Sequence, residues 1–74
     1  MLKLQVVDLA DGTIAEYNAE TVDSITTGKA SLLYSMEDIA GNGMNPTDIL
    51  MIIFFKDGNQ ATFNGNNIIN FKHE

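Results

Sequence analysis

Few side chains in this sequence have the type and spacing that catalysis needs. His73 is the single histidine and stands next to the last residue, where chain ends usually fray. Glu37 and Asp38 are adjacent carboxylates of the kind used in acid–base chemistry, but neighbours on a helix point about 100° apart. No serine, threonine or cysteine is paired with a base by any recognisable spacing. We therefore expect no catalytic residue and a protein that is not an enzyme.

Two patterns resemble ligand-binding motifs without matching them. Gly28-Lys29 is followed by Ala30, and Asp23 stands where a phosphate-binding loop needs its first glycine. The oxygen-rich segments 42–45 and 57–59 lack the alternating acidic residues and the final glutamate of a calcium loop. The sequence also contains no cysteine. We therefore expect no metal ion and no cofactor.

The negative net charge of the chain argues against several classes of binding partner. Ten acidic residues stand against four lysines and no arginine, which gives a net charge of −6. Direct binding to DNA or RNA, or to an anionic membrane surface, requires clustered cations and is not expected. The longest apolar run, 49–55, is too short to span a bilayer, and the first residues do not resemble a secretion signal. These features favour a cytoplasmic location.

The chain aligns with itself without a gap when displaced by 46 residues. Asp11-Gly12 then falls on Asp57-Gly58, and apolar residues of segment 4–25 fall on apolar residues of segment 50–71. Each copy has the pattern of a strand, an Asp-Gly turn, a strand, an Asn-containing turn and a short third strand. The repeat predicts one α+β domain over 1–74, mainly β, with two antiparallel β-meanders. About six short strands would then form a small sheet or a partly open barrel.

The segment 28–48 connects the two copies. Its apolar side chains recur at the spacing of one helical face, with Gly41 placed just beyond the last of them. Pro46 cannot continue a helix. The pattern predicts a helix over 30–40, and the alternative is a further strand over 31–35.

The strand 49–55 is apolar on both faces, whereas the first strand of the earlier copy is amphipathic. A strand of this kind needs cover on both faces. The cover is either the helix at 30–40 or a second protein chain, which is another copy or a different target. The second alternative makes one face of the strand a candidate partner-binding site. Its residues are Ile49, Met51, Ile53 and Phe55.

These features favour a small acidic protein-interaction module that self-associates as a homodimer. A second hypothesis is suggested by the size and acidity, which resemble those of small accessory proteins of phages and mobile elements. In this hypothesis the chain inhibits a host nucleic-acid enzyme with an acidic surface that imitates DNA. A third hypothesis is a structural subunit of a larger assembly. The candidate acidic surface consists of Asp8, Glu16, Glu20, Asp23 and Asp48.

Overall fold

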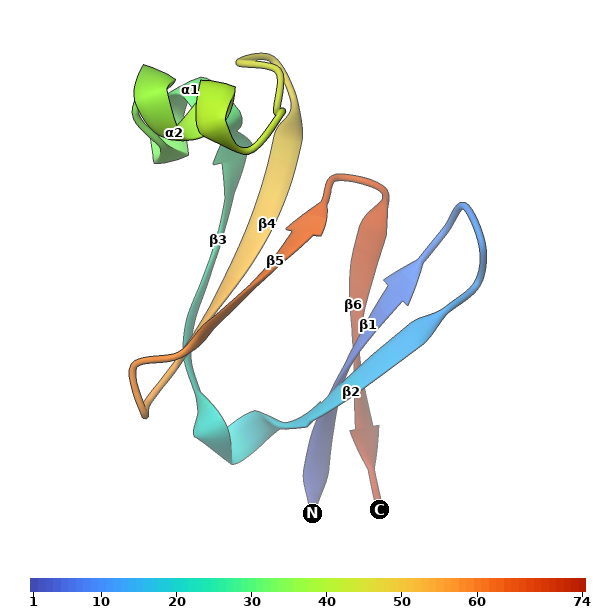
Figure 1. Cartoon of the computed structure of the whole chain (residues 1–74). Helices are drawn as coiled ribbons and strands as arrows, with labels where there is room; N and C mark the ends of the chain where they lie inside the picture. The colour runs from blue at the N-terminus through green and yellow to red at the C-terminus, as the bar shows by residue number, and fades with distance from the viewer.

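The computed structural model describes all 74 residues and contains two three-stranded antiparallel sheets with two short helices at one end (Figure 1). The strands are β1 (Leu2–Asp8), β2 (Ile14–Asn18), β3 (Val22–Lys29), β4 (Ile49–Phe55), β5 (Gln60–Asn64) and β6 (Asn67–His73). A 3-10 turn, η1 (Ala19–Thr21), joins β2 to β3, and the helices are α1 (Ala30–Leu33) and α2 (Met36–Gly41). The prediction of a mainly β, antiparallel fold is confirmed. Neither helix has the length and apolar character that crossing a membrane requires.

Both predicted Asp-Gly hairpins are present, and they connect β1 to β2 and β4 to β5. Gly12 and Gly58 have φ angles of 75° and 90°, which a residue with a Cβ rarely adopts. Asp11 and Asp57 each accept a hydrogen bond of 2.9 Å from the main-chain N–H two residues later. The Asp-Gly pairs that predict the two hairpins therefore form their turns, through the positive φ of the glycine and the hydrogen bond accepted by the aspartate.

The third strand of each segment does not complete a meander. Sheet A has the order β2-β1-β6, and sheet B has the order β3-β4-β5. After β2, the side chain of Asn18 accepts a hydrogen bond from the N–H of Glu20, and η1 leads the chain away to sheet B. After β5, the chain returns through β6 to sheet A (Figure 1). The prediction of two meanders is wrong, because each third strand pairs with the first strand of the other segment.

The strand pairing does not follow the gapless repeat. Tyr17 lies opposite Leu4, whereas Phe63 lies opposite Met51 and not opposite Leu50. The cause is the loop between β1 and β2, which is one residue longer than the loop between β4 and β5. Because side chains alternate across a strand, a shift of one residue exchanges its two faces. The displacement of 46 residues places Leu50 at the position of Leu4, but in the structure Met51, on the opposite face of β4 from Leu50, packs with Leu4.

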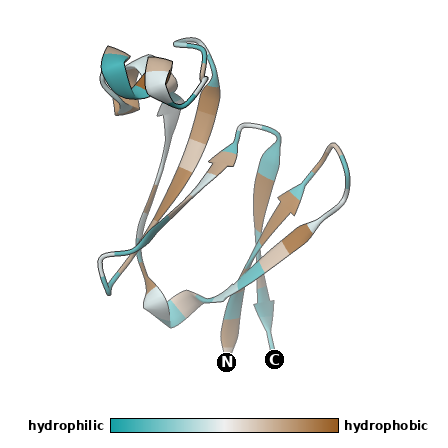
Figure 2. Cartoon of the chain, viewed as in Figure 1, coloured by the Kyte–Doolittle hydropathy of each residue, from teal (hydrophilic) through white to brown (hydrophobic).

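The larger core cluster lies between the two sheets. Leu4 and Val6 from β1 pack with Met51 and Ile53 from β4, and all four are buried. A second cluster lies on the opposite face of β4, where Leu50 packs with side chains of α1 and α2. The apolar character of β4 along its length is visible in Figure 2. The strand is thus covered on both faces within one chain.

The predicted helix over 30–40 is present as two helices. Tyr34 has an extended backbone with φ −131° and ψ 155°, so it ends α1. The hydroxyl of Ser35 accepts a hydrogen bond of 3.2 Å from the N–H of Asp38 and begins α2. Gly41 is the last residue of α2 rather than the residue beyond it. The alternative of a strand over 31–35 is wrong.

Candidate interaction surface

The four residues predicted to bind a partner do not form one exposed face. Met51 and Ile53 are buried in the core between the sheets, and Phe55 is half-buried with its ring centroid 5.1 Å from that of Tyr17. Only Ile49, at the start of β4, is exposed. The cover on this face is sheet A of the same chain, and neither the helix nor a second chain is needed there. The helices cover the opposite face, because the two faces are exchanged relative to the prediction.

Exposed apolar side chains gather instead on the outer face of sheet A. Val7 lies opposite Ile14 of β2 on one side and Ile68 of β6 on the other. We call these three residues the apolar row, and it spans about 10 Å across the sheet. Ile14 and Ile68 are 56% and 42% exposed. Leu9 is also exposed beside the row, where its N–H donates to the carbonyl of Asn66.

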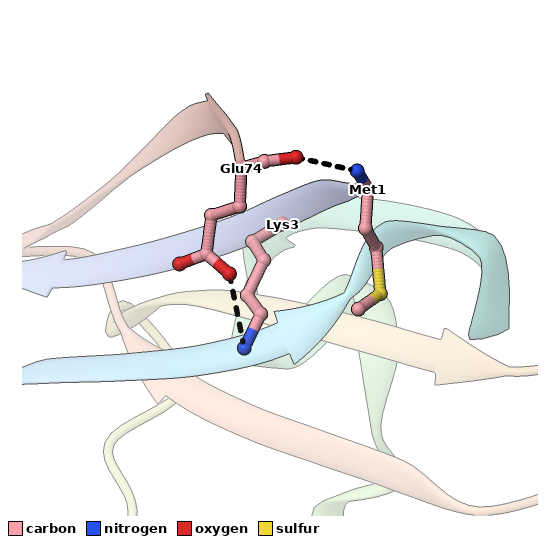
Figure 3. A network of polar contacts seen from close by, with 3 residues as sticks. All are labelled: Met1, Lys3 and Glu74. Atoms are coloured by element: carbon pink, nitrogen blue, oxygen red, sulfur yellow. Dashed lines mark hydrogen bonds and ion pairs between the residues drawn. The ribbon is translucent and has the colours of Figure 1, made fainter.

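The main-chain bonds between β1 and β6 show which groups of β6 point outward. Met1 and Glu74 exchange two main-chain hydrogen bonds, of 2.8 and 2.9 Å, as Figure 3 shows for one of them. Lys3 Nζ also lies 3.7 Å from the Glu74 carboxylate (Figure 3). At the other end of the strand, Asn66 accepts a bond from Leu9. Antiparallel bonding alternates, so the even-numbered residues of β6 bond to β1 and the odd-numbered ones face outward.

The outward-facing positions make β6 an open edge. Their main-chain N–H and C=O groups point away from β1, and no further strand pairs with β6. These positions are Asn67, Ile69, Phe71 and His73. Phe71 is 62% exposed although it shares a face with the buried residue Leu4, which lies opposite it.

The other three edge strands carry features that oppose pairing with another chain. β2 has only five residues and an exposed glutamate, Glu16, at its centre. β3 has an irregular register between Val22 and Ser24, which twists the edge. β5 has five residues, and the hydroxyl of Tyr34 lies 3.3 Å from that of Thr62. β6 has seven residues in regular register and no acidic side chain.

The five residues of the candidate acidic surface are distributed over different parts of the fold. Asp8 ends β1 and Glu16 lies on β2, while Glu20 and Asp23 lie in and after η1. The β1–β2 loop and η1 lie at opposite ends of β2 (Figure 1). Asp48 precedes β4 and accepts a hydrogen bond of 3.0 Å from the N–H of Asn45. Asp8 similarly accepts a bond from Ala10, so two of the five stabilise local turns.

No three His, Asp or Glu side chains lie close enough together to hold a metal ion. Of two open hollows on the surface, one contains Asp48 and the other Tyr34 as its single titratable group. The pKa of Asp11 is lowered by the hydrogen bond from the main-chain N–H of Thr13 and then by the bond from the Thr13 hydroxyl. This carboxylate is fully exposed and belongs to a turn.

Comparisons with protein-family models, with characterised proteins and with solved structures give no significant match. The apolar row and the open edge of β6 were not predicted from the sequence. The residues of β6 indicate an interaction site only once the strand order is known, because that order places β6 at the edge of sheet A.

Proposed function

We propose that the chain is a small acidic, non-enzymatic protein-interaction module that associates with a second copy of itself through the edge of sheet A. The observation that supports this proposal is the open edge of β6, which combines unpaired main-chain groups with two exposed apolar side chains, Ile68 and Phe71. Full burial of each of these side chains would contribute roughly 1.5–3 kcal/mol of free energy, and this contribution is missing while they are exposed to water. Pairing with another strand satisfies the main-chain groups and covers the side chains in one step.

The charge of β6 is compatible with contact between identical chains at this edge. Two copies with a net charge of −6 repel each other. The strand β6 carries Lys72 and no carboxylate, so two β6 strands can approach without bringing carboxylates of these strands together. Salt screens charges over about 8 Å at physiological ionic strength, so association should strengthen as salt is added.

The two other hypotheses receive less support. An inhibitor that imitates DNA needs its carboxylates on one side, whereas the candidate residues are distributed over β1, β2, η1, β3 and the segment before β4. A structural subunit of a larger assembly needs a second contact surface in addition to this edge. It differs in continuing to grow beyond a dimer, and the measured mass distinguishes the two.

The test is the mass in solution, measured by sedimentation or light scattering across protein and salt concentrations. We expect a monomer–dimer equilibrium that shifts toward dimer at higher salt. Phe71→Asp should weaken the dimer at least tenfold, because it places a carboxylate on the edge. The matched control is Leu32→Asp on α1, which changes an even more exposed apolar residue, at 79%, far from β6. A wild-type chain that stays monomeric at all concentrations contradicts the proposal.

A further inference from the structure

We infer that the two copies join through antiparallel pairing of β6 with β6, with Asn70 of one copy opposite Asn70 of the other. This inference rests on the proposed self-association and specifies its strand and its register. The result is a continuous six-stranded sheet in the order β2-β1-β6-β6-β1-β2. The partner is a second copy because the edge is complementary to itself in hydrogen bonding and in apolar side chains, and the pairing brings no carboxylate of one β6 against a carboxylate of the other.

Hydrogen bonding selects the register. Antiparallel strands of identical copies are related by a two-fold axis perpendicular to the sheet, so each residue meets one on the same face. Centring the pair on Asn70 places Asn67 opposite His73 and Ile69 opposite Phe71. All outward-facing residues then exchange main-chain bonds, about eight in total. A shift along the strand in either direction leaves at least one outward-facing residue of each copy without a partner.

The side chains agree with this register. Phe71, exposed in the single chain, meets the β-branched side chain of Ile69 on the inner face of the combined sheet. Aromatic and β-branched side chains form favourable cross-strand pairs. On the outer face, Ile68 meets the aliphatic stem of Lys72. No two like charges lie directly opposite each other.

The same construction fails at β2, which is the other edge of sheet A. Pairing two β2 strands about their centre places Glu16 opposite Glu16, and like charges at opposing positions are unfavourable. The strand β2 also offers fewer outward-facing groups, since it has five residues and β6 has seven. Sheet A therefore has one edge suited to pairing and one that resists it, which limits this mode of growth to a dimer.

A disulfide across the two-fold axis tests the register directly. The sequence has no cysteine, so Asn70→Cys provides a single thiol per chain. Asn70 would form a non-hydrogen-bonded pair with its copy, with Cα atoms about 4.5 Å apart, within the range that a disulfide spans. We expect the oxidised variant to run mainly as a covalent dimer on a non-reducing gel. The control is Glu16→Cys, on the same face of sheet A but on β2, which should stay mostly monomeric. Equal cross-linking of both variants overturns the inference.

A proline on the outward-facing edge provides a second test. Phe71→Pro removes an N–H that points away from β1, so the bonds between β6 and β1 are kept. We expect this variant to keep the circular dichroism spectrum of the wild type and to lose the dimer. A wild-type dimer, combined with no cross-link in the Asn70→Cys variant and a dimeric Phe71→Pro variant, overturns the register but leaves self-association intact. A wild type that is monomeric at every concentration refutes the proposed function itself.

Discussion

Gly65, in the turn between β5 and β6, allows a quantitative prediction because its backbone lies against the start of β4. A Cβ added at this position would lie 2.9 Å from Cβ of Ile49, 3.0 Å from its Cγ2 and 3.0 Å from its main-chain oxygen. The φ angle of Gly65 is not positive, so an alanine there suffers from crowding and not from an unfavourable dihedral. Rotation of the Ile49 side chain relieves only the contact with Cγ2.

The expected cost of Gly65→Ala follows from these contacts. Overpacking of this kind costs about 1–3 kcal/mol, and the smaller entropy of the unfolded alanine chain returns about 0.4–1 kcal/mol. The middle of these two ranges gives a net loss of about 1–2 kcal/mol. For a domain of this size each kcal/mol lowers Tm by roughly 4–8 °C, so Tm should fall by about 4–16 °C.

The assay is thermal and urea unfolding followed by circular dichroism. The matched control is Gly41→Ala at the end of α2, where an added Cβ meets nothing within 4 Å. This variant should be as stable as the wild type or more stable by up to about 1 kcal/mol. Adding Ile49→Ala to Gly65→Ala should recover part of the loss, since it removes Cγ2 and keeps the main-chain oxygen. A Gly65→Ala protein with the Tm of the wild type would show that the reasoning is wrong.

Three further predictions concern the core, a helix start and a turn. Ile53→Ala should destabilise the fold by about 2–5 kcal/mol in urea unfolding, since the side chain is fully buried between the sheets, whereas Leu32→Ala should change stability by no more than about 0.5 kcal/mol. Ser35→Ala should cost about 1 kcal/mol by the same measurement, because it removes the hydroxyl that caps α2. The lowered pKa of Asp11 means that its ionised form adds stability above the ordinary aspartate pKa and that this contribution is lost as the pH falls through the folded pKa. The difference in Tm between the wild type and Asp11→Asn should therefore shrink in acid, and a difference that is constant with pH would contradict this assignment.

The local elements of this fold are largely predictable from short patterns. The two Asp-Gly pairs identify both hairpins, because the turn needs a positive φ that Gly12 and Gly58 supply. The apolar run 49–55 identifies β4. The break in the helix also has a signal in the sequence, since Ser35 with Asp38 three residues later is a typical helix start. The apolar spacing over 30–40 fits one continuous helix, and the helix start at Ser35 was therefore not predicted.

The partners of the third strands are not predictable in this way. Whether β3 follows β2 in one sheet or joins β4 in another depends on contacts between residues far apart in the sequence. The deciding feature is β4, which is apolar on both faces and is therefore most stable as the central strand of a sheet with cover on each side. β3 and β5 flank it, and β6 is left to pair with β1.

The location of the candidate site follows from the same long-range pairing. The gapless repeat predicted that Met51 and Ile53 form a face of β4 that needs cover from the helix or from a second chain. The two hairpin loops differ in length by one residue, and in the structure these side chains pack against Leu4 and Val6. Once that core is formed, β6 is an edge strand that combines unpaired main-chain groups with the exposed side chains of Ile68 and Phe71. Its sequence gives no sign of this until the strand is known to be an edge. The lack of a carboxylate on β6 is then informative. Charged side chains on an edge strand oppose pairing with another chain, and an acidic protein that avoids such pairing is expected to place a carboxylate on its longest regular edge strand.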